Sequence, residues 1–124
     1  MASQEDLTAF IASSFRSVWA LEVLCHLRSS PEIELSPGEL VTALRASELV
    51  VRQSLAELTA AGLALVAEDG RAKYAPATAE LDRLALAAEE RYATAPDAVR
   101  RIIVKAANPG LTAFADAFRL KGKP

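Results

Sequence analysis

The segment Ser47 to Leu63, SELVVRQSLAELTAAGL, contains the side chains with the clearest binding chemistry. Arg52 and Gln53 stand next to each other, and these residue types form paired hydrogen bonds with the edges of guanine and adenine, respectively. The same segment has one Arg, no Lys and two carboxylates, Glu48 and Glu57. Its chemistry therefore suits recognition through hydrogen bonds better than strong attraction to a polyanion.

No combination of residues supports catalysis. His26 is the only histidine and stands beside Cys25, the only cysteine, so neither a CxxC nor an HxxxH zinc motif exists. The chain also has no P-loop and no G-x-S-x-G motif. We therefore expect no enzymatic activity, no metal and no cofactor. We interpret Cys25 as a small buried residue, with a redox sensor as the alternative.

Composition favours one compact, mainly α-helical domain. The chain has 124 residues, of which 52% are hydrophobic and only 6% are aromatic, with Ala and Leu abundant. A single cysteine excludes an intrachain disulfide, and no apolar run approaches the roughly 18 residues of a membrane span. The N-terminus lacks the features of a signal peptide. We expect a soluble cytoplasmic protein.

Charge is unevenly distributed along the chain. Residues 1–95 have 14 acidic and 8 basic residues, a net charge of −6, whereas residues 96–124 have 2 acidic and 6 basic residues, a net charge of +4. Nucleic-acid-binding domains usually present a basic patch. The acidic part therefore counts against strong nonspecific binding of nucleic acid, although it allows local basic contacts.

The first third of the chain has helical periodicity. Apolar residues recur at three- and four-residue steps from Leu7 to Leu27, which predicts one long amphipathic helix or two helices joined near Ser13-Ser14. Pro31 ends this pattern because proline cannot continue the hydrogen-bond ladder. The alternating residues 32–35 predict one short strand.

Two capped helices and a hairpin are predicted next. Ser36, Pro37 and Glu39 form a helix-start signature, and the helix should run to about Arg45. Ser47 starts the following helix, which ends at Gly62, with one apolar face expected to be buried: Val51, Leu55 and Leu58. Residues 63–75 predict a two-stranded hairpin around a type I′ turn at Asp69-Gly70.

The remaining chain is predicted to be helical. Helices should start near Thr78 and near Pro96, with an inward-facing stripe in the second helix at Val99, Ile102, Ile103 and Ala106. A last short helix should contain Leu111, Phe114 and Phe118. We divide the chain into an N-terminal flanking helix (1–14), a central unit (15–76) and a C-terminal helical extension (77–124), all within one compact domain.

The order of elements in residues 15–76 resembles the winged helix-turn-helix of bacterial transcription regulators of the MarR, ArsR and PadR kinds. The resemblance covers about half of the chain, and its most specific part is the spacing Leu55-x-x-Leu58-x-x-x-Gly62-Leu63 followed by Asp69-Gly70. It implies that residues 40–45 are the supporting helix, residues 48–61 the recognition helix and Asp69-Gly70 the tip of the wing.

The resemblance also implies a DNA-binding face. The N-terminal residues of a recognition helix meet base edges in the major groove, which makes Ser47, Glu48, Leu49, Val50, Arg52 and Gln53 candidate DNA-binding residues. Arg52 would read guanine, Gln53 adenine, and Leu49 or Val50 a thymine methyl group. The alternative is that Arg52 and Gln53 are simply solvated, and that Leu49 or Val50 is turned into the core by a shift in helix phase.

Three further positions would contact phosphates. Arg71 and Lys73 are two residues apart on one strand and should share a face, and Arg45 lies at the end of the supporting helix. The alternative for the strand residues is ordinary edge-strand charge that limits aggregation. The basic end of the chain, with Arg119, Lys121 and Lys123, would either stabilise a helix end or hold phosphates.

The expected function is a DNA-binding transcription regulator on a double-stranded operator. In MarR-like proteins the flanking helices build a homodimer, and the alternative here is that they cover the core of one monomer. The competing function is a winged helix that docks a protein partner through Leu49 and Val50 or the Phe-rich tail and does not bind DNA. A ligand pocket between the flanking helices would be compatible with regulation, and the sequence names no ligand.

Overall fold

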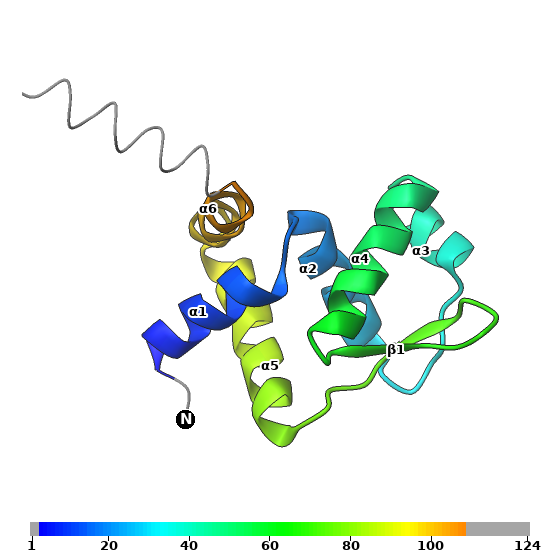
Figure 1. The fold of residues 1–124 in the computed structure, drawn as a ribbon, viewed down its shortest axis with the longest axis horizontal. Helices are drawn as coiled ribbons and strands as arrows, with labels where there is room; N and C mark the ends of the chain where they lie inside the picture. The colour runs from blue at the N-terminus through cyan, green and yellow to red at the C-terminus, as the bar shows by residue number, and fades with distance from the viewer. Residues whose placement is uncertain (1–2, 109–124) are drawn as a thin grey trace, which may run out of the picture.

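The computed structural model describes residues 3–108 of the chain (Figure 1). This part is mainly helical, with one small antiparallel sheet, as the composition predicts. The last predicted helix, with Leu111, Phe114 and Phe118, lies outside the described residues, as do Arg119, Lys121 and Lys123. The elements in chain order are α1 (Gln4–Ser14), α2 (Val18–Ser29), α3 (Pro37–Leu44), α4 (Glu48–Ala60), β1 (Ala64–Val66), β2 (Ala72–Tyr74), α5 (Ala79–Thr94) and α6 (Pro96–Ala107).

The N-terminal periodic stretch forms two helices, which settles the alternative left open by the sequence. Phe15 leaves the helical conformation with φ −118° and ψ 118°, and Ser17 accepts a hydrogen bond from the Ala20 N–H to start α2. Phe15 is buried and packs edge-on against Phe10, with ring centroids 5.8 Å apart. The two helices meet at 106°. None of the helices in residues 3–108 is long and apolar enough to cross a membrane by itself. Only the bent pair α1 and α2, taken together, has the length and apolar composition of a membrane span.

The helix starts follow the predicted caps. The Ser36 hydroxyl accepts from the Glu39 N–H while the Glu39 carboxylate accepts from the Ser36 N–H. Two backbone N–H groups that have no partner within the helix are therefore hydrogen-bonded. α3 ends at Arg45, which adopts the left-handed conformation, and α4 begins directly after the Ser47 cap. The tight connection fixes α4 against α3.

The extended segments differ from prediction in two details, one before the hairpin and one at its turn. Residues 32–35 do not form a full strand, and only Leu35 pairs, through two 2.8 Å hydrogen bonds with Ala72. The turn is not type I′, because that turn needs positive φ at both central residues and of Asp69 and Gly70 only Gly70, at φ +90°, has it. Instead, Ala67 accepts from the Gly70 N–H and donates to the Arg71 carbonyl, which makes a three-residue loop.

The C-terminal helices also follow the sequence with one exception. Thr78 caps α5, and Val99 and Ile103 of α6 are buried, with Ile102 half-buried. Ala106, predicted to face inward, is exposed within the described residues. It lines a hollow of about 560 Å³ between the ends of α1 and α6, so the last turn of α6 extends past the packed part of the interface.

Helix α2 lies at the centre of the molecule. Helices α1, α5 and α6 pack together on one side of it, and α3, α4 and the hairpin on the other (Figure 1). Its residues Leu21, Leu24 and Leu27 are fully buried, and a single cluster of buried apolar side chains runs from α1 to α6. This core holds α4 by its buried face and leaves the opposite face of α4 exposed.

Candidate nucleic-acid interface

The N-terminal half of α4 presents the predicted residues in the predicted phase. The Ser47 hydroxyl accepts from the Val50 N–H at 3.1 Å, and the buried face contains Val51, Leu55 and Leu58, as expected from the sequence. The opposite face exposes Glu48, Leu49, Arg52, Gln53 and Ala56. A shift in helix phase is therefore excluded as the explanation for Leu49, which is 65% exposed, whereas Val50 is half-buried and less available than predicted.

Arg52 is held by Glu48 on this face. The Glu48 Oε1 atom accepts hydrogen bonds from Nε of Arg52 at 3.0 Å and from Nη2 at 2.8 Å. Both side chains are about two-thirds exposed, and an exposed pair at this spacing contributes only about 0.3–0.5 kcal/mol. The guanidinium is therefore aligned by Glu48 yet released at low energetic cost.

The hairpin exposes Arg71 and Lys73, while Ala72 between them is fully buried, so the predicted alternation is confirmed. The Asp69 carboxylate accepts a hydrogen bond from the Arg71 N–H at 3.0 Å and lies 3.8 Å from Arg71 Nε. Lys73 pairs across the sheet with Leu65. Arg71 is partly neutralised by Asp69, and Lys73 makes no ion pair within residues 3–108.

Arg45 marks the end of α3 with an unusual backbone. Its φ of 54° lies in the left-handed region, and it is the one non-glycine residue among those described with a positive φ. The Ala46 N–H bonds back to the Val41 carbonyl at 3.3 Å, which closes the helix. The exposed Arg45 side chain stands where a cation is favoured by the helix dipole and is accessible to a phosphate.

An apolar groove adjoins these residues and was not predicted. It has a volume of about 520 Å³ and runs between the exposed side of α4, from Arg52 to Ala60, and the hairpin, with Pro37 at one end. Val66 of β1 lines this groove and is 41% exposed, while its neighbour Leu65 is 60% exposed on the opposite face of the strand. The sequence holds a signal for this surface, because two neighbouring apolar residues in a strand must place one on each face.

The exposed charges of α3, α4 and the hairpin balance. Exposed basic side chains are matched in number by exposed acidic ones: Arg45, Arg52, Arg71 and Lys73 against Glu39, Glu48, Glu68 and Asp69. The pKa of Glu39 is lowered, mainly by hydrogen bonds from Ser36 and to a lesser degree by the charge of Arg71. Glu57, in contrast, does not belong to this face, since its carboxylate accepts from the Arg16 N–H at 2.7 Å at the α1–α2 joint.

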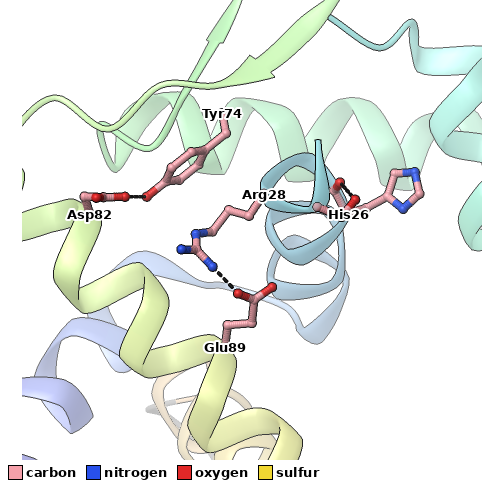
Figure 2. A network of polar contacts seen from close by, with 6 residues as sticks. His26, Arg28, Tyr74, Asp82 and Glu89 are labelled. Atoms are coloured by element: carbon pink, nitrogen blue, oxygen red, sulfur yellow. Dashed lines mark hydrogen bonds and ion pairs between the residues drawn. The ribbon is translucent and has the colours of Figure 1, made fainter. Parts of the chain in front are cut away.

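A polar network fixes the hairpin on the helices (Figure 2). Arg28 of α2 pairs with Glu89 of α5 and lies over the Tyr74 ring, 5.2 Å from its centroid. The Tyr74 hydroxyl in turn donates to Asp82 at 2.6 Å. Burial, helped by the bond to Asp82, raises the pKa of Tyr74 to about 12. The network links β2 to α2 and α5 and therefore sets the position of the wing-like hairpin relative to the core.

Cys25 and His26 are neighbours on α2. Cys25 is half-buried, and burial, followed by the nearby Glu89 and Glu22 carboxylates, raises the pKa of its thiol to about 12, which suppresses the reactive thiolate. The His26 ring points away from the Arg28–Glu89 pair (Figure 2). Among residues 3–108 no three His, Cys, Asp or Glu side chains are grouped closely enough to hold a metal ion.

Comparison with known proteins adds no relative. No protein-family model matches the chain, and neither a curated protein nor a solved structure matches it.

Proposed function

We propose that this chain is a transcription regulator whose residues 15–76 act as a winged helix-turn-helix on double-stranded DNA. The observation that carries the proposal is the exposed edge of α4, where Leu49, Arg52 and Gln53 follow a capped N-terminus and Arg52 lines the same groove as Val66 and Gly70 of the hairpin. The order of α2, the Leu35 bridge, α3, α4 and the hairpin supports it.

Each exposed residue has a role in the proposed complex. Arg52 leaves Glu48, at a cost of about 0.3–0.5 kcal/mol, and pairs with guanine, where a bidentate contact contributes about 1–3 kcal/mol of discrimination. Gln53 reads adenine and Leu49 contacts a thymine methyl group. Arg71, Lys73 and Arg45 hold phosphates beside the groove and fix the register of α4.

We further propose that two copies associate through the flanking helices and act in the cytoplasm, where bacterial DNA lies. Leu86 of α5 and Val104 of α6 are 45% and 53% exposed, and both helices lie across α2 from α4. A two-fold interface there would leave both α4 helices free for successive half-sites.

A second function has its own supporting observation. The exposed basic side chains of α3, α4 and the hairpin are balanced by exposed acidic ones, and the groove that Val66 lines is apolar. Such a surface suits a protein partner, because exposed apolar patches with polar rims mark protein contacts. In that case the chain would be an adaptor that does not bind DNA.

Binding of duplex DNA at two salt concentrations tests the proposal. Three phosphate contacts give one bound protomer a slope of about −2.7 in log affinity against log salt, so a fourfold rise in salt should weaken its binding roughly 40-fold. The six contacts of a dimer give a slope of about −5.4, or roughly 1,800-fold. Genomic fragments, including the protein's own promoter, serve as ligands. Absence of binding even at low salt would reject the DNA function and favour the protein partner.

A further inference from the structure

A second concave site lies against α2, between α3 on one side and α5 and α6 on the other. It has a volume of about 380 Å³ and is formed where four helices meet, by Val18, Trp19 and Glu22 of α2, Leu44 of α3, Tyr92 of α5 and Arg100 of α6. This volume lies within the range of small-molecule pockets. None of these residues belongs to the α4 face, so the site is independent of the proposed DNA contacts.

Two side chains of opposite charge in this site, Glu22 and Arg100, both contact Tyr92. The Tyr92 hydroxyl donates to Glu22, and the Arg100 guanidinium lies over the Tyr92 ring, 5.6 Å from its centroid. Burial and the bond to Glu22 raise the pKa of Tyr92, so the phenol keeps its proton and orients the carboxylate. Glu22 and Arg100 therefore line the same hollow, beside the Tyr92 side chain that both of them contact.

Both charged groups retain capacity for a ligand. Glu22 accepts one hydrogen bond from Tyr92, whereas a carboxylate has about four acceptor positions. Arg100 donates from Nη1 to Asp97 at 3.1 Å, and this pair is exposed, with side chains 50% and 83% accessible. Asp97 therefore competes only weakly with a ligand for the guanidinium. The guanidinium has five donors in total.

The apolar wall of the site is an uncovered aromatic ring. Trp19 is 40% exposed, although tryptophan is usually highly buried, and it stands beside the apolar Val18 and Leu44. A flat ring would cover this face, since aromatic pairs stack in offset or edge-on geometry and bury large areas.

We propose that this hollow binds a small aromatic zwitterion, with its ammonium group toward Glu22, its carboxylate toward Arg100 and its ring against Trp19. The paired opposite charges set the ligand class, because a ligand with only one charge would satisfy one of the two groups and leave the other unmatched. An aromatic α-amino acid is the simplest molecule of this class.

Titration of the full chain with L-phenylalanine tests this site directly. Trp19 is the only tryptophan, so its fluorescence reports on the hollow without a label, and calorimetry measures the same binding independently. Phenylacetate, which lacks the ammonium, and phenethylamine, which lacks the carboxylate, should each bind at least about tenfold more weakly, as expected for loss of a charged hydrogen bond.

Variants assign the two ends of the ligand. Arg100→Gln should weaken L-phenylalanine binding at least about tenfold and leave phenethylamine binding unchanged. Glu22→Gln should also weaken L-phenylalanine binding at least about tenfold, but leave phenylacetate binding unchanged. Arg101→Gln, an exposed neighbour outside the site, is the control. Absence of both heat and fluorescence change up to the solubility limit of L-phenylalanine would overturn the proposal. So would equal binding of benzyl alcohol, which would show only apolar burial.

Discussion

Replacing Glu48 with Gln is the perturbation that best separates a DNA-binding face from an inert one. Glu48 holds Arg52 through two hydrogen bonds of 3.0 and 2.8 Å and adds a negative charge to the same exposed edge of α4. The substitution keeps the size of the side chain and removes its charge. Arg52 is then no longer neutralised.

The expected changes in binding and in stability have opposite signs. In the variant the exposed pair no longer has to be broken when Arg52 contacts DNA, which favours that contact by about 0.3–0.5 kcal/mol. A carboxylate about 9 Å from a phosphate is repelled by about 0.5 kcal/mol in water, and this repulsion also disappears. Together these effects favour binding by about 1 kcal/mol, roughly fivefold per protomer. Stability should fall by about 0.5–1.5 kcal/mol, because the first turn of α4 loses both the pair and a favourable charge on the helix dipole.

Fluorescence anisotropy with a labelled duplex of arbitrary sequence at low salt measures the affinity, and urea denaturation measures the stability. Glu80→Gln is the matched control, since Glu80 also lies in a first turn, that of α5, and pairs with Arg83 at 2.6 Å. The control should lose stability without a change in DNA affinity. Unchanged or weaker binding of Glu48→Gln to this duplex would refute the reasoning that α4 faces phosphates.

Three further predictions concern the fold. Ser54→Ala should stabilise the protein by about 1 kcal/mol in urea denaturation, because the Ser54 hydroxyl is buried without a hydrogen-bond partner among residues 3–108; a loss of stability would show that the hydroxyl has a partner. Gly62→Ala should cost at least about 1–2 kcal/mol, since Gly62 has φ +77° and a Cβ there would lie 3.2 Å from Cδ1 of Leu81; a neutral effect in the same assay would contradict this backbone geometry. Stability should also fall as pH rises from about 9 to about 12, because the folded state raises the pKa values of Cys25 and Tyr74 to about 12 and so retains protons that the unfolded chain has released. Cys25→Ala should flatten the first part of that decline in pH-dependent denaturation, and an identical slope in this variant would assign the effect elsewhere.

Local sequence signals predicted most of the helical architecture. Caps at Ser36, Ser47 and Thr78 set helix starts because the hydrogen bonds that define them span only three residues. The salt bridge between Glu48 and Arg52 was not predicted, although its four-residue spacing with Glu first is a recognisable signal. This pair directly changes what the candidate reader Arg52 has available for DNA.

Features that depend on distant residues were not predictable from spacing. The Arg28–Glu89 pair joins residues 61 positions apart, and Tyr92 and Glu22 are 70 positions apart. The turn at Asp69-Gly70 was predicted as type I′ because the dipeptide favours it. In the structure the Asp69 carboxylate instead accepts from the Arg71 N–H, and the ladder closes at Ala67 and Arg71, one residue earlier than predicted on the first strand.

Selection of bound sequences from a random duplex library, with the native chain and two variants, tests base reading by α4 most directly. The native chain should enrich one motif with a guanine position that depends on Arg52. Arg52→Ala should weaken binding and lose preference at that position, whereas Lys73→Ala should weaken binding to all sequences about equally and keep the motif. Absence of any enriched motif for the native chain, or equal effects of the two substitutions on every sequence, would contradict DNA reading by α4.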